Sequence, residues 1–292
     1  MLKFEKQLND YLDFLEKKKK RSSRTVRNYD LYLRRFLLWL DKGDITELVK
    51  IDLQIIQKYK KWLSMYKDPI RKTKLKDNTK NYHLIALRSF LRYLERKKIK
   101  TFNAKRVKLE KVDKVKPKSI EQSEVELLIT SPNKIVQDKV IQLRDRSLLE
   151  LIMCSGLKVS ELASLTINQI DSKNKVINIL RKKIEYKVGL SNQAIYWLNK
   201  YLSKRNYDND YIFVGHDRAQ TARLEKSSQG LSPRSIERIV EKYAKIAGIR
   251  KKVTPQVLRN SYIKRLITGG KKVDDLQKIL GHKSIESTLN YY

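Results

Sequence analysis

Apolar residues in the first part of the chain recur three and four positions apart, the spacing that places them on one face of an α-helix. Within residues 1–103 this pattern predicts four helices: residues 4–18, a helix capped by Ser23 or Thr25, residues 52–66, and residues 78–97. Each predicted helix has one apolar face, so we expect the four to pack around a shared core. The pattern therefore predicts a small four-helix domain at residues 1–103.

Residues 104–118 differ from the helices before them. Seven lysine and arginine side chains are scattered among valines here, no helical or strand period persists, and Pro117 stands near the end. We interpret this segment as a basic linker between two domains. Its charge favours a path across a phosphate backbone, although a solvated tether has the same composition.

The pattern changes again at residues 119–292, which we expect to form a second domain. Ser123 and Glu126 match a capping box at the start of its first helix. Further helices are predicted at residues 138–155, 159–165, 193–204, 233–247, 254–268 and 273–280. Residues 175–190 alternate apolar and polar positions on both sides of a charged turn, which predicts a β-hairpin. The whole chain is therefore predicted to be mainly α, with one small β-sheet in the second domain.

The charge of the chain indicates a class of partner. Lysine and arginine number 66 against 32 aspartate and glutamate, so the formal net charge is +34. A compact protein this basic repels itself unless a polyanion neutralises it, which favours nucleic acid or an anionic membrane surface. The codon usage of an AT-rich genome can add lysine, but such usage would add glutamate as readily. We therefore predict a nucleic-acid-binding protein.

Membrane insertion, secretion and metal chemistry find little support in the sequence. The apolar runs fall far short of the roughly 20 residues that a membrane-spanning helix needs, and residues 1–10 lack a secretory signal. We therefore expect a cytoplasmic protein without a membrane partner. Cys154 is the single cysteine, and His83, His216 and His282 lack metal-ligand spacing, so we expect no disulfide, metal or cofactor.

Three short motifs in the second domain indicate a particular chemistry. Residues 145–162 read DRSLLELIMCSGLKVSEL, residues 254–261 read TPQVLRNS, and residues 280–284 read LGHKS. Tyr291 follows nine residues after His282. In its order and spacing this set resembles the tyrosine recombinase (phage integrase) family, at a size similar to the Xer members of that family.

The first domain is similar to the helical core-binding domain of the same family, through Ser23, Thr25, Tyr29 and Phe36. The resemblance therefore covers essentially the whole chain, and it implies a site-specific DNA recombinase. In such enzymes a tyrosine attacks a DNA phosphodiester and leaves a 3′-phosphotyrosine and a free 5′-hydroxyl, so rejoining needs no ATP, metal or other cofactor. The implied partners are double-stranded DNA and further copies of the chain, as a homotetramer on two DNA sites.

The resemblance also implies roles for individual residues. Tyr291 matches the nucleophile of the family, while Tyr292 is one residue off the family spacing. Arg259 matches the second of two arginines that stabilise the phosphorane-like charge, and His282 stands where the family has His or Trp. The family also has a lysine on a β-turn of its small sheet.

The turn of the predicted hairpin offers more than one match for that lysine. Lys182 and Lys183 both fit, and Arg181 remains open because the alignment of the turn is ambiguous. A lysine in a charged turn is commonly only solvated, so the pattern alone does not separate Lys182 from an ordinary surface residue.

Two positions depart from the family pattern. Lys158 stands where the family has its first arginine, and Gln256 stands where a His or Lys usually precedes the second one. Arginine holds two phosphate oxygens through a planar fork, whereas lysine is a mobile point charge, and glutamine cannot carry a proton near neutral pH. Loss of one well-placed donor typically costs about 2.7–4 kcal/mol, or roughly 10²–10³ in rate. Glu161 is expected to orient Lys158.

These departures leave more than one function open. The first is a recombinase that cleaves DNA through Tyr291, with an activity that is weak or absent. The second is a catalytically inactive relative that only binds DNA. Lys158 fits either natural divergence or an engineered change that traps a complex. A basic RNA-binding or structural protein remains only if the motif match is a coincidence, and the motifs do not specify a DNA target sequence.

Overall fold

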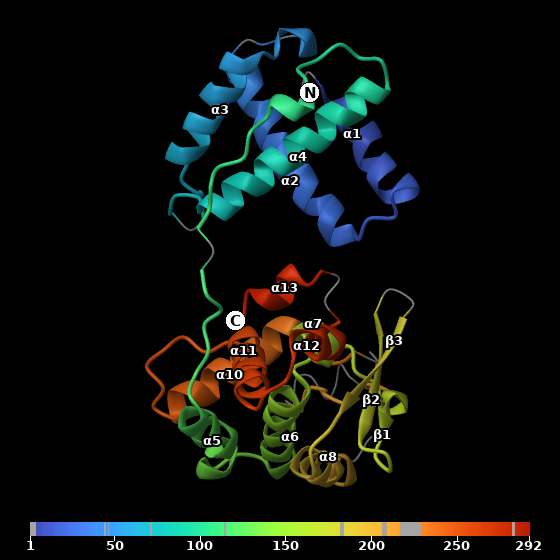
Figure 1. The fold of residues 1–292 in the computed structure, drawn as a ribbon, viewed down its shortest axis with the longest axis vertical. Helices are drawn as coiled ribbons and strands as arrows, with labels where there is room; N and C mark the ends of the chain where they lie inside the picture. The colour runs from blue at the N-terminus through green and yellow to red at the C-terminus, as the bar shows by residue number, and fades with distance from the viewer. Residues whose placement is uncertain are drawn as a thin grey trace. The chain divides into compact units, whose positions relative to one another are not determined.

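The chain separates into two compact units in a computed structural model, Met1–Asp113 and Lys114–Tyr292 (Figure 1). The structure describes residues 4–43, 45, 47–70, 72–113, 115–181, 184–205, 209–216, 229–281 and 284–292. Helices dominate both units, and one small antiparallel sheet lies in the second. The predicted fold class is therefore confirmed. Within the described residues, no helix combines the length and the apolar character needed to span a bilayer.

The helical unit is built from α1 (Glu5–Asp13), extended by a π-helical turn at Phe14–Lys18, and from α2 (Ser23–Lys42), α3 (Leu53–Met65) and α4 (Asp77–Arg96). Short 3₁₀ turns follow at Leu48–Lys50 and Ala104–Arg106. The cap of α2 is Ser22, whose hydroxyl accepts a hydrogen bond from the Thr25 amide, so the predicted cap at Ser23 or Thr25 was wrong by one residue or more. A buried aromatic cluster fills the core: Tyr11, Phe36, Tyr59 and Phe90.

The predicted linker is divided between the two units. Residues 104–113 belong to the helical unit, where Val107 is fully buried. The Asn81 side chain donates to the Glu110 carbonyl at 2.9 Å and accepts from the Glu110 amide at 2.8 Å, as a paired strand would. Residues 115–118 belong to the second unit, where the Lys118 carbonyl accepts a hydrogen bond from Asn260.

The second unit surrounds a central helix, α6 (Lys139–Ser155), which packs against α5, α8, α11 and β3. The other helices are α5 (Gln122–Thr130), α7 (Val159–Ala163), α8 (Asn192–Lys204), α10 (Pro233–Ile246), α11 (Pro255–Thr268), α12 (Val273–Leu280) and α13 (Glu286–Leu289), with 3₁₀ turns at Ser131–Lys134 and Ile167–Gln169. The capping box of α5 is formed by Glu121 and Glu124, two residues before the predicted pair Ser123 and Glu126.

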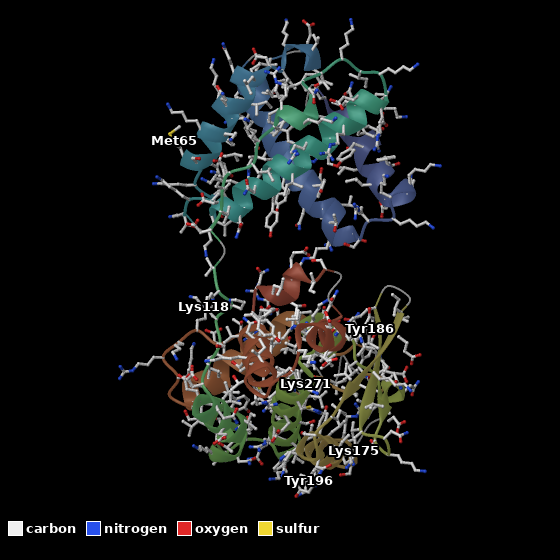
Figure 2. The ribbon with its side chains drawn as sticks, viewed as in Figure 1. Met65, Lys118, Lys175, Tyr186, Tyr196 and Lys271 are labelled. Carbon is white, nitrogen blue, oxygen red and sulfur yellow. The ribbon has the colours of Figure 1, made fainter. Side chains whose placement is uncertain are left out.

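The sheet has three antiparallel strands in the order β1 (Ile170–Asp171), β2 (Val176–Arg181) and β3 (Ile184–Gly189). It contains the predicted hairpin, with Ile179 opposite Tyr186 and Arg181 opposite Ile184. Figure 2 shows Tyr186 toward the turn of this hairpin and Lys175 near its other end. Because β3 also contacts α12, the turn end of β2 is brought toward the end of that helix.

Candidate active site

Lys158 lies where two helices meet. The α6 helix ends at Gly156, whose φ of +58° is the left-handed geometry that favours glycine. Lys158 is the cap of α7, and its amide donates to the Glu161 carboxylate at 2.9 Å. Its side chain is 49% exposed, and its Nζ lies 4.0 Å from Glu161 Oε1. This lysine is therefore held at the backbone, while about half of its side chain is exposed, and partial burial lowers the pKa of its ammonium group.

Glu161 is bound mainly to Arg181. The Arg181 guanidinium donates two hydrogen bonds to the Glu161 carboxylate, from Nε at 2.7 Å and from Nη2 at 2.8 Å. Burial alone would raise the pKa of Glu161, but the hydrogen bonds from Arg181 and from the Lys158 amide outweigh it and hold this pKa below its ordinary value. The expected partner of Glu161 was the Lys158 side chain, and the structure adds Arg181 as the closer cation.

Arg259 is almost fully buried on α11, at 2% exposure. Thr254 caps this helix with its side chain, and Pro255 occupies the first turn, where its missing N–H costs no hydrogen bond. One guanidinium nitrogen of Arg259 donates to the Gly156 carbonyl, and the other donates to the Leu280 carbonyl at 3.4 Å. Arg259 therefore joins the ends of α6 and α12.

Tyr291 follows α13 and lies against α11. Its hydroxyl donates to Asn260 Oδ1 at 3.3 Å, and Gln256 Nε2 donates to the same oxygen at 2.8 Å. Burial raises the pKa of Tyr291, while the charge and hydrogen bonding of Arg259 act against this rise. The neighbouring Tyr292 points elsewhere, because its hydroxyl donates to the Lys271 carbonyl at 2.7 Å.

A cleft of about 270 Å³ opens beside these groups. Lys158, Gln256 and Arg259 line it, together with Lys252 and Glu237 among others. Three predicted site residues thus line one cleft. Tyr291 interacts electrostatically with one of them, Arg259. Among the described residues, no three His, Cys, Asp or Glu side chains are placed to hold a metal ion.

Two predicted site residues, Lys182 and His282, lie outside the described residues, as does Lys183. The structure adds Asn260, which sequence reasoning missed, as a partner of Tyr291 and Gln256. A signal for it was present, because Gln256 and Asn260 are four residues apart on one helix face. No local signal links Glu161 with Arg181, which are 20 residues apart.

Both units match family models. Residues 118–292 match the phage integrase family, and residues 8–98 match the phage integrase N-terminal SAM-like domain. The first match covers most of the second unit and more than half of the chain.

Relatives and solved structures match along nearly the full length. The chain is 31% identical to tyrosine recombinase XerC of Myxococcus xanthus over 97% of this chain and 91% of that protein. It is 26% identical to tyrosine recombinase XerD of Vibrio cholerae, over 97% and 90%. The fold is similar to that of XerH site-specific recombinase bound to its difH substrate, with a TM-score of 0.75, 20% identity, and coverage of 98% and 81%. The chain therefore belongs to the phage integrase family of tyrosine recombinases.

Proposed function

We propose that this protein is a site-specific recombinase that cleaves and rejoins DNA through Tyr291. The observation that carries the proposal is the contact of Tyr291 with α11, where Asn260 Oδ1 accepts a hydrogen bond from the Tyr291 hydroxyl and the positive charge of Arg259 acts on it. In the proposed step, Tyr291 Oη bonds to phosphorus and loses its proton, while the bond from phosphorus to the 5′ oxygen breaks and that oxygen gains a proton. Rejoining reverses each of these changes.

The other site residues serve this step by charge and hydrogen bonding. Arg259 is buried and fixed, so it can oppose the charge that grows on the phosphate oxygens without reorganising. Lys158 adds a mobile positive charge at the cleft. By the resemblance, we further propose His282 as a donor to the phosphate and Lys182 as the hairpin cation.

The proposed partner is double-stranded DNA. Lysine and arginine exceed aspartate and glutamate along the whole chain, and the similar XerH was solved on its difH substrate. A phosphate backbone would neutralise this excess. We propose that a helical core-binding domain (residues 1–103), a basic linker (104–118) and a catalytic domain (119–292) enclose the duplex, and that four copies assemble on two sites.

A second function has its own support. The Lys158 side chain is half exposed, and the Gln256 amide donates to Asn260 and cannot carry a proton near neutral pH. A chain with Lys158 in place of a fixed arginine donor, and Gln256 in place of a residue that carries a proton, would cleave DNA slowly or not at all. The alternative is therefore a DNA-binding relative that occupies its site without cutting.

One experiment separates the two functions. The full chain is incubated with a library of duplexes that each carry a nick near the centre, because the short cleaved fragment then diffuses away and traps the covalent intermediate. The recombinase predicts an adduct that survives SDS and a new 5′-hydroxyl end. Retention of DNA on filters without any adduct would support the binding relative instead.

A further inference from the structure

One guanidinium nitrogen of Arg181 has no hydrogen-bond partner among the described residues. Its side chain is only 10% exposed and is fixed on two sides, by the Glu161 carboxylate and by the ring of Tyr186, whose centroid lies 5.4 Å from the guanidinium carbon. The third nitrogen, Nη1, is buried and has no hydrogen-bond partner within the part of the chain that the structure describes. Buried donors without a partner are rare, and each calls for an explanation.

This nitrogen, Nη1, lies against Gly281 at the C-terminal end of α12. Gly281 has a φ of +60°, and a side-chain carbon there would collide with Arg181 Nη1. The carbonyl of the preceding residue, Leu280, accepts from Arg259 Nη2 at 3.4 Å. Two guanidinium groups, one from β2 and one from α11, therefore converge on the peptide between Leu280 and Gly281.

The charges around this corner are unbalanced. Lys158, Arg181 and Arg259 interact with a single carboxylate, that of Glu161. Burial lowers the pKa of Arg259, Glu161 opposes this shift, and the positive charge of Arg181 adds to it. Three cations held around one anion leave a net positive charge, which favours the binding of a further anion.

We propose that Arg181 binds a non-bridging oxygen of the scissile phosphate through Nη1 and so supplies the fixed guanidinium that Lys158 does not provide. This inference rests on the proposed function, because it assigns a residue to the same phosphate. Glu161 holds the guanidinium plane in place, so the donor is oriented before the phosphate arrives. Lys158 then contributes only general positive charge.

The rival explanation is structural: Arg181 simply fastens the hairpin to α7 through Glu161. If Arg181 has only this structural role, its replacement should affect folding, DNA binding and cleavage of every substrate alike. A phosphate ligand would matter only where the phosphate oxygens carry charge. Replacement of one non-bridging oxygen by a methyl group removes that charge and therefore separates the two roles.

The first test compares cleavage of a nicked duplex with cleavage of the same duplex carrying a methylphosphonate at the scissile position. For Arg181→Lys and Arg181→Ala, we expect a rate of adduct formation about 10²–10³-fold below wild type on the phosphate. On the methylphosphonate, the same variants should come within about tenfold of wild type. The control is Lys187→Ala, which removes an exposed positive charge from the same hairpin and should cleave normally. Equal losses on both substrates, or no loss at all, would overturn the proposal.

Two further arms complete the test. In the Arg181→Ala background, Lys158→Arg should raise the rate of adduct formation at least tenfold, because it supplies a second guanidinium beside Glu161. Without DNA, tungstate serves as a phosphate-like anion in a calorimetric titration, and Arg181→Ala should bind it at least tenfold more weakly than wild type. Equal tungstate affinity, including none in either protein, would count against the inference. A tungstate difference without any wild-type adduct would instead refute the cleavage function while leaving the anion site.

Discussion

The two units of the chain bury polar groups in different ways. In the described part of the helical unit, His83 is the one charged or strongly polar side chain that is buried. The second unit buries a whole set of charged side chains: Arg144, Asp145, Arg146, Glu150 and Arg259. Because burial of charge is costly unless the charge is paired, a buried charge marks a place where pairing or function compensates for it.

The two cores accommodate buried ionisable groups in two ways, by keeping a group neutral or by pairing charges. His83 is kept neutral: burial, with the charge of Arg35, lowers its pKa to about 3. The second unit keeps its charges and pairs them, as Asp145 accepts from Arg144 at 2.8 Å and from the Tyr243 hydroxyl at 2.8 Å. Arg259 differs from these cations, because it donates to two backbone carbonyls, interacts with Tyr291 and lines the cleft.

The largest effect is expected at Tyr291, the proposed nucleophile. Tyr291→Phe should reduce the SDS-resistant adduct to background and leave DNA retention unchanged, because only the attacking oxygen is removed. Tyr292→Phe is the matched control, since its hydroxyl contacts the Lys271 carbonyl and its side chain is half exposed. Gel analysis of both variants on nicked duplexes measures this. Loss of the adduct in the Tyr292 variant alone would show that the assignment is off by one residue.

The next largest effect is expected on stability, when an arginine–aspartate ion pair is broken in the buried part of the second unit rather than near the surface of the helical unit. Asp145→Ala should destabilise the second unit by about 3–5 kcal/mol, because it leaves Arg144 buried without its carboxylate. Asp30→Ala, which removes a partner of Arg34, whose side chain is 35% exposed, should cost about 0–1 kcal/mol. Hydrogen–deuterium exchange in urea reports the stability of each unit separately. Equal costs would show that burial does not distinguish the two units.

Acid should weaken the helical unit through His83. Its folded pKa of about 3 lies below the ordinary 6.5, so the unfolded chain takes up a proton that the folded chain excludes. This contribution to stability is complete above about pH 6.5, and it falls by about 1.4 kcal/mol per pH unit between pH 6.5 and the folded pKa of about 3. His83→Gln should flatten that part of the pH profile, again followed by exchange in the helical unit. An identical profile in the variant would mean that His83 titrates normally.

The smallest effect is expected at Gln256. Its amide donates to Asn260, which also accepts a hydrogen bond from the Tyr291 hydroxyl, so Gln256→Ala should misplace the proposed nucleophile only slightly. Loss of one such hydrogen bond costs about 0.5–1.5 kcal/mol, which corresponds to roughly tenfold or less in the cleavage rate. Gln122→Ala, which removes an exposed amide bonded to Glu126, should have no effect. A loss of about 10³ would instead assign Gln256 a direct part in the chemistry.

Local patterns were enough to predict most of the fold. The helical period of residues 138–155 predicted α6 nearly to the residue, because Asp138 caps it and Gly156 ends it. The short strand β1 was not predicted, since its two residues are fixed by pairing with Val176 and Ile177 rather than by their own sequence. Similarly, a four-residue helix such as α13 carries too little periodicity to be detected.

Only the candidate site residues that belong to sequence motifs could be predicted. Tyr291, Arg259, Lys158 and Gln256 were named from the resemblance, and the structure brings the last three to one cleft. The contacts that hold them join distant parts of the chain: Glu161 with Arg181, and Tyr291 with Asn260. The first contact joins α7 to β2 and the second joins the chain end to α11, and no local pattern contains either of them.

The proposed function requires that Tyr291 itself becomes covalently bound to DNA. The most direct measurement is mass spectrometry of the adduct after nuclease and protease digestion, which locates the nucleotide on a single side chain. We expect a 3′-phosphonucleotide on Tyr291 and none on Tyr292. A nucleotide on any other residue, or clear DNA retention with no modified peptide at all, would contradict it.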